Sequence, residues 1–173
     1  ERDGHSDGAT ISRQLADHIR LLDPTRPVTH CLCSVSPEGV TGLAANKMVD
    51  GGRDYFAAAT EQVASPLDIV GYNYMPDRFE KDRRSFPDRV FCATETVNGD
   101  ILNGWDKVER FPWVVGDFVW TAMDYLGEAG LGRAEIDEMP RGLAAYPYRL
   151  SGCGVLDIAG RQRAAAFYRK CVW

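Results

Sequence analysis

Short apolar runs and amphipathic stretches alternate along the chain, and this alternation predicts its fold. Runs rich in β-branched and aromatic residues between turn-forming residues indicate strands at 27–33, 67–74, 89–96 and 113–120. Helical spacing or turn-bounded charged stretches indicate helices at 8–22, 53–64, 77–86, 103–111 and 161–172. Loops rich in glycine are expected at 34–52 and 127–152. Because near-continuous apolar strands alternate with helices, we expect an α/β fold with a parallel sheet.

The helices at the two ends of the chain are the most regular. The first carries one apolar face made of Ile11, Leu15, Ile19 and Leu22, and the last carries one made of Ala164, Phe167, Tyr168 and Cys171. The charged helix 77–86 is expected to be a solvated face from Asp77 to Arg84, and Trp105 is expected in the core.

The residues at the ends of the predicted strands separate two ways of closing the sheet. An open nucleotide-binding sheet has a glycine-rich turn after its first strand, and none of the four strand ends here has one. They end instead at His30, at Asn73 and Tyr74, at Glu95 and at Trp120. Polar and aromatic residues at the carboxyl ends of parallel strands are typical of a (β/α)₈ barrel. Four strands are half of such a barrel.

Composition excludes several classes of partner. The 25 acidic residues outnumber the 20 basic ones, the net charge is −5, and the basic residues form no stripe that binds nucleic acid. No apolar run approaches about 18 residues, so we expect no membrane span. The five cysteines show no repeated spacing and only three histidines accompany them, so we expect neither a metal site nor a cofactor. Nothing here fixes the cellular compartment.

Four motifs occur in order at consistent spacing. They are Leu22–Thr29 (LDPTRPVT), Gly71–Tyr74 (GYNY), Ala93–Thr96 (ATET) and Gly116–Tyr125 (GDFVWTAMDY). Together they resemble the catalytic barrel of glycoside hydrolase family two, the β-galactosidase group, and the similarity extends to Trp173. The resemblance implies that residues 1–173 are a partial catalytic barrel domain, the C-terminal half with strands five to eight.

The resemblance also implies roles for four residues. Glu95 matches the catalytic nucleophile, Trp120 the aromatic platform under the sugar, and Asn73 and Tyr74 a substrate-binding pair beside the nucleophile. A retaining glycosidase attacks the anomeric carbon with an ionised carboxylate, which hydroxyl groups such as that of Tyr74 help to keep ionised. The expected reaction is hydrolysis of terminal β-D-galactosyl residues. β-Glucuronidase and β-mannosidase stay open, because the loops of the first half of the barrel help to read the sugar.

One departure from the family pattern sets the expectation for the isolated chain. The family's acid/base is a glutamate after an asparagine at the end of strand four, and Glu1 has no asparagine before it. The acid/base is therefore expected outside this chain, and the chain alone is expected to be a poor or inert catalyst. Two uncovered sheet edges also favour aggregation, so we expect dependence on the missing N-terminal half or on another copy of the chain.

Overall fold

The computed structural model describes residues 7–33, 49–50, 53–125 and 150–173. The elements run in the order α1 (Gly8–Leu22), β1 (Thr29–Leu32), β2 (Val49–Asp50), β3 (Arg53–Asp54), α2 (Tyr55–Ala64), β4 (Ile69–Asn73), α3 (Arg78–Ser85), β5 (Phe91–Val97), η2 (Asn98–Asp100), α4 (Ile101–Arg110), β6 (Val114–Trp120) and α5 (Ala164–Val172). They divide into two compact units, Glu1–Glu95 with Asp106–Asp117, and Thr96–Trp105 with Phe118–Trp173. Most of the predicted loops 34–52 and 127–152 lies outside the described residues.

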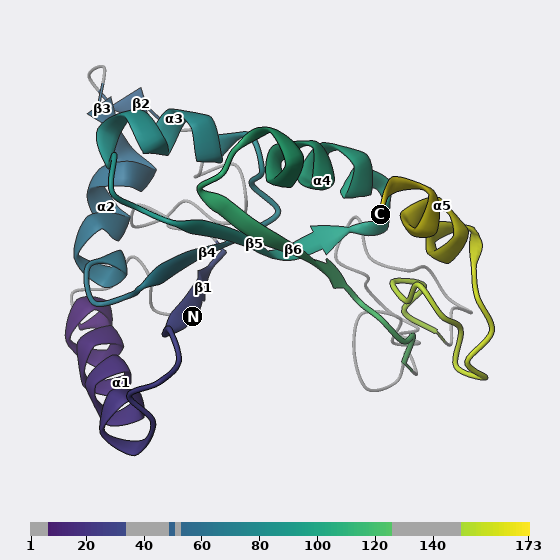
Figure 1. The fold of residues 1–173 in the computed structure, drawn as a ribbon, viewed down its shortest axis with the longest axis horizontal. Coiled ribbons are helices and arrows are strands. Elements are labelled where there is room, and N and C mark those ends of the chain that lie inside the picture. The colour runs from purple at the N-terminus through teal and green to yellow at the C-terminus, as the bar shows by residue number, and fades with distance from the viewer. Residues whose placement is uncertain (1–6, 34–48, 51–52, 126–149) are drawn as a thin grey trace, which may run out of the picture. The chain divides into compact units, whose positions relative to one another are not determined.

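The main sheet has the strand order β1-β4-β5-β6, in which each strand neighbours the next strand of the same sheet, while β2 and β3 form a separate two-stranded sheet (Figure 1). The β1–β4 and β4–β5 pairs are parallel, and the Phe91 N–H donates to the Trp113 carbonyl where β5 meets the start of β6. Four parallel strands alternating with helices are the arrangement of half of a (β/α)₈ barrel. The predicted fold class is therefore confirmed.

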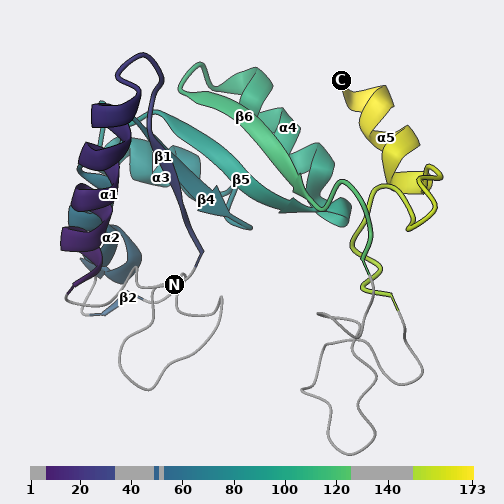
Figure 2. The same cartoon turned by 90° about the horizontal axis from the view of Figure 1, so that it is seen from below.

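The first unit keeps its core on one face of the sheet. Successive side chains of a strand point to opposite faces, and on β4 and β5 one set is apolar. Tyr72 of β4 packs edge-on against Phe56 of α2 and stacks on Phe79 of α3, with centroid separations of 5.5 and 5.7 Å. Figures 1 and 2 show α2 and α3 covering the sheet on this side. The opposite face carries Gly71 and Asn73.

Helix α1 has the predicted bounds but packs through a different face. Its buried residues are Gly8, Ser12 and Ala16, and the Ser12 hydroxyl donates to the Val63 carbonyl of α2 at 2.8 Å. The predicted apolar face is turned to solvent in the described part of the chain, and Leu15 is 59% exposed. Small side chains on the packed face of α1 let it lie against α2. The pattern of apolar residues alone did not reveal that this face would be the packed one.

Helix α3 is not the solvated face that its charges suggested. Arg78 and Asp82 are buried and paired, and the Arg78 guanidinium donates to both Asp82 carboxylate oxygens, at 3.1 and 2.7 Å. The Tyr72 hydroxyl donates to the same carboxylate at 2.7 Å, and Arg78 also donates to Asp54 of β3 at 2.9 Å. The prediction was wrong for these two residues because a complete set of partners compensates their burial.

The second unit combines α5 with the segment that follows β6. The Trp105 and Trp173 rings lie 5.0 Å apart, and Trp105 is half-buried rather than fully in the core. Helix α5 confirms the predicted C-terminal helix, but Ala166 is its buried residue and Phe167 of the predicted face is 57% exposed.

In the part of the chain that the structure describes, no helix is long and apolar enough to cross a membrane.

Candidate active site

A register shift brings Asn73 and Glu95 opposite each other at the carboxyl ends of β4 and β5. Tyr72 pairs with Ala93, but the next residue, Asn73, pairs with Glu95, so Thr94 is the extra residue of a bulge. Without the shift, Asn73 would face Thr94 instead. Both sequence-predicted residues therefore lie opposite each other on adjacent strands of the first unit.

Tyr74 is tied to the same site through its backbone. It has a φ of 60°, the left-handed region that residues with a side chain rarely adopt, and its N–H donates to the Glu95 carbonyl at 2.8 Å. Such conformations cost about 1–3 kcal/mol and cluster at functional sites. The structure thus brings Asn73, Tyr74 and Glu95 together. The contact between the Tyr74 hydroxyl and the Glu95 carboxylate stays a prediction.

Thr94 contributes a contact that the sequence did not reveal. Its hydroxyl donates to the Asn73 amide oxygen at 2.7 Å. Gly71 supplies the space, because a Cβ at that position would lie 2.6 Å from Thr94 Cγ2 and 2.9 Å from the His30 carbonyl oxygen. The structure thus directs the Thr94 hydroxyl to Asn73.

Trp120 belongs to the second unit, at the end of β6. It is 36% exposed and meets the Tyr125 ring edge-on at a centroid distance of 6.5 Å. An accessible indole face suits the predicted sugar platform. That Trp120 joins Glu95 in one pocket stays a prediction.

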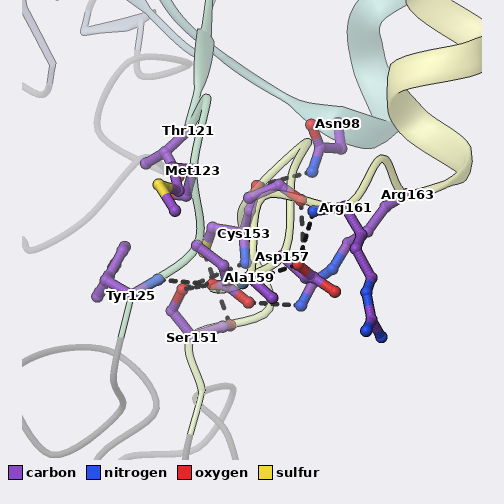
Figure 3. A network of polar contacts seen from close by, with 12 residues as sticks. Asn98, Thr121, Met123, Tyr125, Ser151, Cys153, Asp157, Ala159, Arg161 and Arg163 are labelled. Atoms are coloured by element: carbon purple, nitrogen blue, oxygen red, sulfur yellow. Dashed lines mark hydrogen bonds and ion pairs between the residues drawn. The ribbon is translucent and has the colours of Figure 1, made fainter.

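Within the second unit, a C-terminal segment contacts the chain that follows β5 and the chain that follows β6 (Figure 3). The Cys153 carbonyl accepts from the Asn98 side-chain amide at 2.7 Å and from the Thr121 N–H at 3.1 Å. Asn98 comes three residues after Glu95, and Thr121 comes directly after Trp120. One carbonyl oxygen of the second unit therefore anchors both Asn98 and Thr121. A contact across more than 50 residues leaves no signal in one sequence.

Asp124 is the buried charge of this segment. Its carboxylate accepts from the Arg163 guanidinium, the Ser151 hydroxyl and the Tyr125 N–H. Burial alone would raise the pKa of Asp124, but these three donors outweigh it and hold the pKa below its ordinary value. The structure therefore gives Asp124 an anchoring role in this segment.

Gly154 allows the backbone near Asp124 and the backbone near Leu156 to come together. A Cβ there would lie 2.2 Å from the Asp124 nitrogen and 2.3 Å from the Leu156 carbonyl oxygen, so no side chain fits. The Asp124 N–H donates to that Leu156 carbonyl at 2.9 Å.

Among the described residues, no group of three or more acidic, histidine or cysteine side chains is arranged to hold a metal ion.

Known proteins resemble this chain over most of its length, although no family model matches it. A solved glycosyl hydrolase family 2 member from Bacteroides cellulosilyticus aligns with 100% of the chain at 32% identity and a TM-score of 0.74, and the chain covers 19% of it. The beta-galactosidase BoGH2A of Bacteroides ovatus is 23% identical over 94% of the chain and 21% of that protein. The chain is related to glycoside hydrolase family 2.

A third relative is named for a different sugar. A putative beta-glucuronidase of Formosa agariphila is 32% identical over 45% of the chain and 7% of its own length. The chain thus spans about a fifth of the Bacteroides ovatus relative and less than a tenth of the Formosa agariphila one. These relatives confirm the family that the four motifs predicted. The roles of Glu95, Asn73, Tyr74 and Trp120 stay predictions.

Proposed function

We propose that this chain carries the nucleophile and part of the sugar pocket of a retaining β-glycosidase that hydrolyses terminal β-D-galactosyl residues. The observation that supports this most is the pairing of Asn73 with Glu95 at the ends of adjacent parallel strands. Active sites of barrel enzymes are built at this end of the sheet. The chain's relationship to family 2 supplies the reaction class.

Glu95 is proposed to attack the anomeric carbon of the sugar. As the bond from Glu95 to this carbon forms, the glycosidic bond breaks, and the leaving oxygen takes a proton from a second carboxyl group about 5–5.5 Å away. Water, deprotonated by that second group, then releases the sugar and restores Glu95. The second carboxyl group is proposed to come from the other half of the barrel, which the family resemblance makes strands one to four.

Three further residues are proposed to bind the sugar. Asn73 offers a buried amide, and Tyr74 places a phenol directly after the strand end. Trp120 offers an apolar ring on which one face of the sugar rests, and excluding water there strengthens the polar contacts around the nucleophile.

Galactose is proposed because the ATET and GDFVWTAMDY motifs are nearest the β-galactosidase subgroup and because the Bacteroides ovatus relative bears that name. The Formosa agariphila relative keeps β-glucuronidase as the alternative, and β-mannosidase stays open. Turnover of nitrophenyl β-galactoside, β-glucuronide and β-mannoside by the complete protein separates the three. A clear preference for either of the last two would overturn the galactose assignment.

The nucleophile is tested by trapping the covalent intermediate. A 2-fluoro galactoside incubated with the complete protein should add one fluorosugar to the peptide that contains Glu95, as read by mass spectrometry. Glu95→Gln should abolish labelling and lower turnover by orders of magnitude. Glu61→Gln, on the exposed side of α2, is the matched control and should behave as wild type. Labelling of another residue, or full activity of Glu95→Gln, would refute the assignment.

The proposal that the acid/base group lies outside this chain has its own test. General acid/base help is worth about 10²–10⁴ in rate, so a chain without the acid/base should turn over nitrophenyl galactoside far below the complete protein. Adding the missing half of the barrel in trans should restore turnover. Robust turnover by the 173-residue chain alone would contradict the expectation that the acid/base lies elsewhere.

A further inference from the structure

Asn73 presents a buried amide whose orientation matters, because its two ends have opposite polarity. The oxygen accepts hydrogen bonds and the nitrogen donates two. Asn73 is only 2% exposed, so water does not choose between the two orientations. An amide oxygen turned toward an ionised Glu95 or a developing negative charge would repel it, whereas N–H donors would stabilise it.

Thr94 contacts one end of this amide. Its hydroxyl donates to Asn73 Oδ1 at 2.7 Å, which leaves the amide nitrogen at the other end of the planar group. Threonine is β-branched, so its side chain is restricted to few rotamers and the hydroxyl is held in place. The bulge at the β4–β5 register shift is what sets Thr94 beside Asn73 while Glu95 pairs with it.

Gly71 provides the space that the Thr94 side chain occupies. The Thr94 side chain fills the space above it, since a Cβ at position 71 would meet Thr94 Oγ1 at 2.8 Å and Cγ2 at 2.6 Å. The missing side chain of one strand therefore makes the orienting threonine of the next strand possible. Gly71, Thr94 and Asn73 form one contiguous set beside the proposed nucleophile.

We infer that Thr94 is a positioning residue that fixes the Asn73 amide with its N–H donors toward the sugar and the Glu95 carboxylate. This inference rests on the proposed function and adds to it the group that orients the substrate-binding amide. Thr94 itself touches no reacting atom. Its contribution is made through Asn73, in the transition state more than in the bound substrate.

The test measures the rate at which a 2-fluoro galactoside labels the complete protein. In Thr94→Val, which keeps the shape but removes the hydroxyl, we expect the limiting labelling rate to fall about 10–100-fold, with the half-saturating concentration changed less than about threefold. Thr94→Ser restores the hydroxyl and should stay within about threefold of wild type. Thr60→Val removes another buried hydroxyl, which donates to the Phe56 carbonyl on α2 at 2.8 Å, and should leave labelling unchanged.

The outcomes separate this inference from the proposed function. Labelling of Glu95 at an undiminished rate in Thr94→Val would overturn the positioning role alone. Equal losses in the Val and Ser variants would assign the effect to packing and overturn it as well. Labelling of a different residue would overturn the nucleophile assignment and, with it, the orientation of the Asn73 amide toward Glu95. A complete absence of labelling in wild type would overturn both the nucleophile assignment and the positioning role of Thr94.

Discussion

The buried ion pair of α3 offers a sharp test of how the first unit is held together. The perturbation is Asp82→Ala. Asp82 is 1% exposed and accepts one bond from the Tyr72 hydroxyl and two from the Arg78 guanidinium. Its removal leaves a buried cation and a buried hydroxyl that have each lost their principal acceptor.

The size of the effect follows from these contacts. Breaking a buried ion pair by removing one partner costs about 3–5 kcal/mol. Arg78 keeps its bond to Asp54 and its position 4.3 Å above the Phe56 ring, which favours the lower end of that range. The orphaned Tyr72 hydroxyl adds about 1 kcal/mol. The sum is about 4 kcal/mol, which corresponds to a fall in the melting temperature of roughly 8–16 °C for a chain of this size.

The control lies on the same helix. Glu80 and Arg84 form an ion pair with the same spacing of four residues and an N–O distance of 2.7 Å, but both side chains are largely exposed. Glu80→Ala should therefore cost no more than about 0.5 kcal/mol. Urea unfolding followed by circular dichroism gives both free energies. Should Asp82→Ala and Glu80→Ala differ by less than 1 kcal/mol, the reasoning about burial would be wrong.

Three other predictions concern single residues. Burial, and then the charge of Asp117, raise the pKa of the Cys92 thiol to about 11. At pH 8 only about one molecule in a thousand therefore carries the Cys92 thiolate. Ellman's reagent should modify the exposed Cys171 long before it modifies Cys92. Because the pKa of Asp124 is lowered in the folded chain, the stability that its carboxylate contributes is complete above the unfolded pKa of about 3.9 and is lost as pH falls through the folded pKa. The difference in unfolding free energy between wild type and Asp124→Asn should therefore shrink below about pH 4. A difference that stays constant with pH would contradict the ionic role. Gly154→Ala should lower the melting temperature by several degrees, because the new Cβ meets backbone atoms that no rotamer change can move, and an unchanged melting temperature would argue against this close approach.

The helix α3 shows why part of the fold could be predicted from the sequence and part could not. Arg78–Asp82 and Glu80–Arg84 are both acid–base pairs four residues apart, and nothing in the local pattern separates them. They begin two residues apart, which is about 200° around the helix, so one pair faces the sheet and the other faces water. Only the position of the helix on the sheet decides between them.

The candidate site follows the same rule. Glu95 and Asn73 could be predicted because strand ends leave a local pattern and because the motifs are distinctive. The bulge at Thr94 could not, since a one-residue shift in pairing depends on two strands that are distant in sequence. The role of Gly71 depends on that shift and was hidden with it.

The two units interleave along the chain, and this affects how sequence blocks could be exchanged with a relative. The segment Asp106–Asp117 belongs to the first unit but is flanked on both sides by residues of the second. A chimera with a single crossover inside it would take residues 96–105 from one parent and 118–173 from the other. The Asn98 amide would then meet a foreign Cys153 carbonyl. Recombination libraries should therefore inherit 96–105, 118–125 and 150–173 from the same parent.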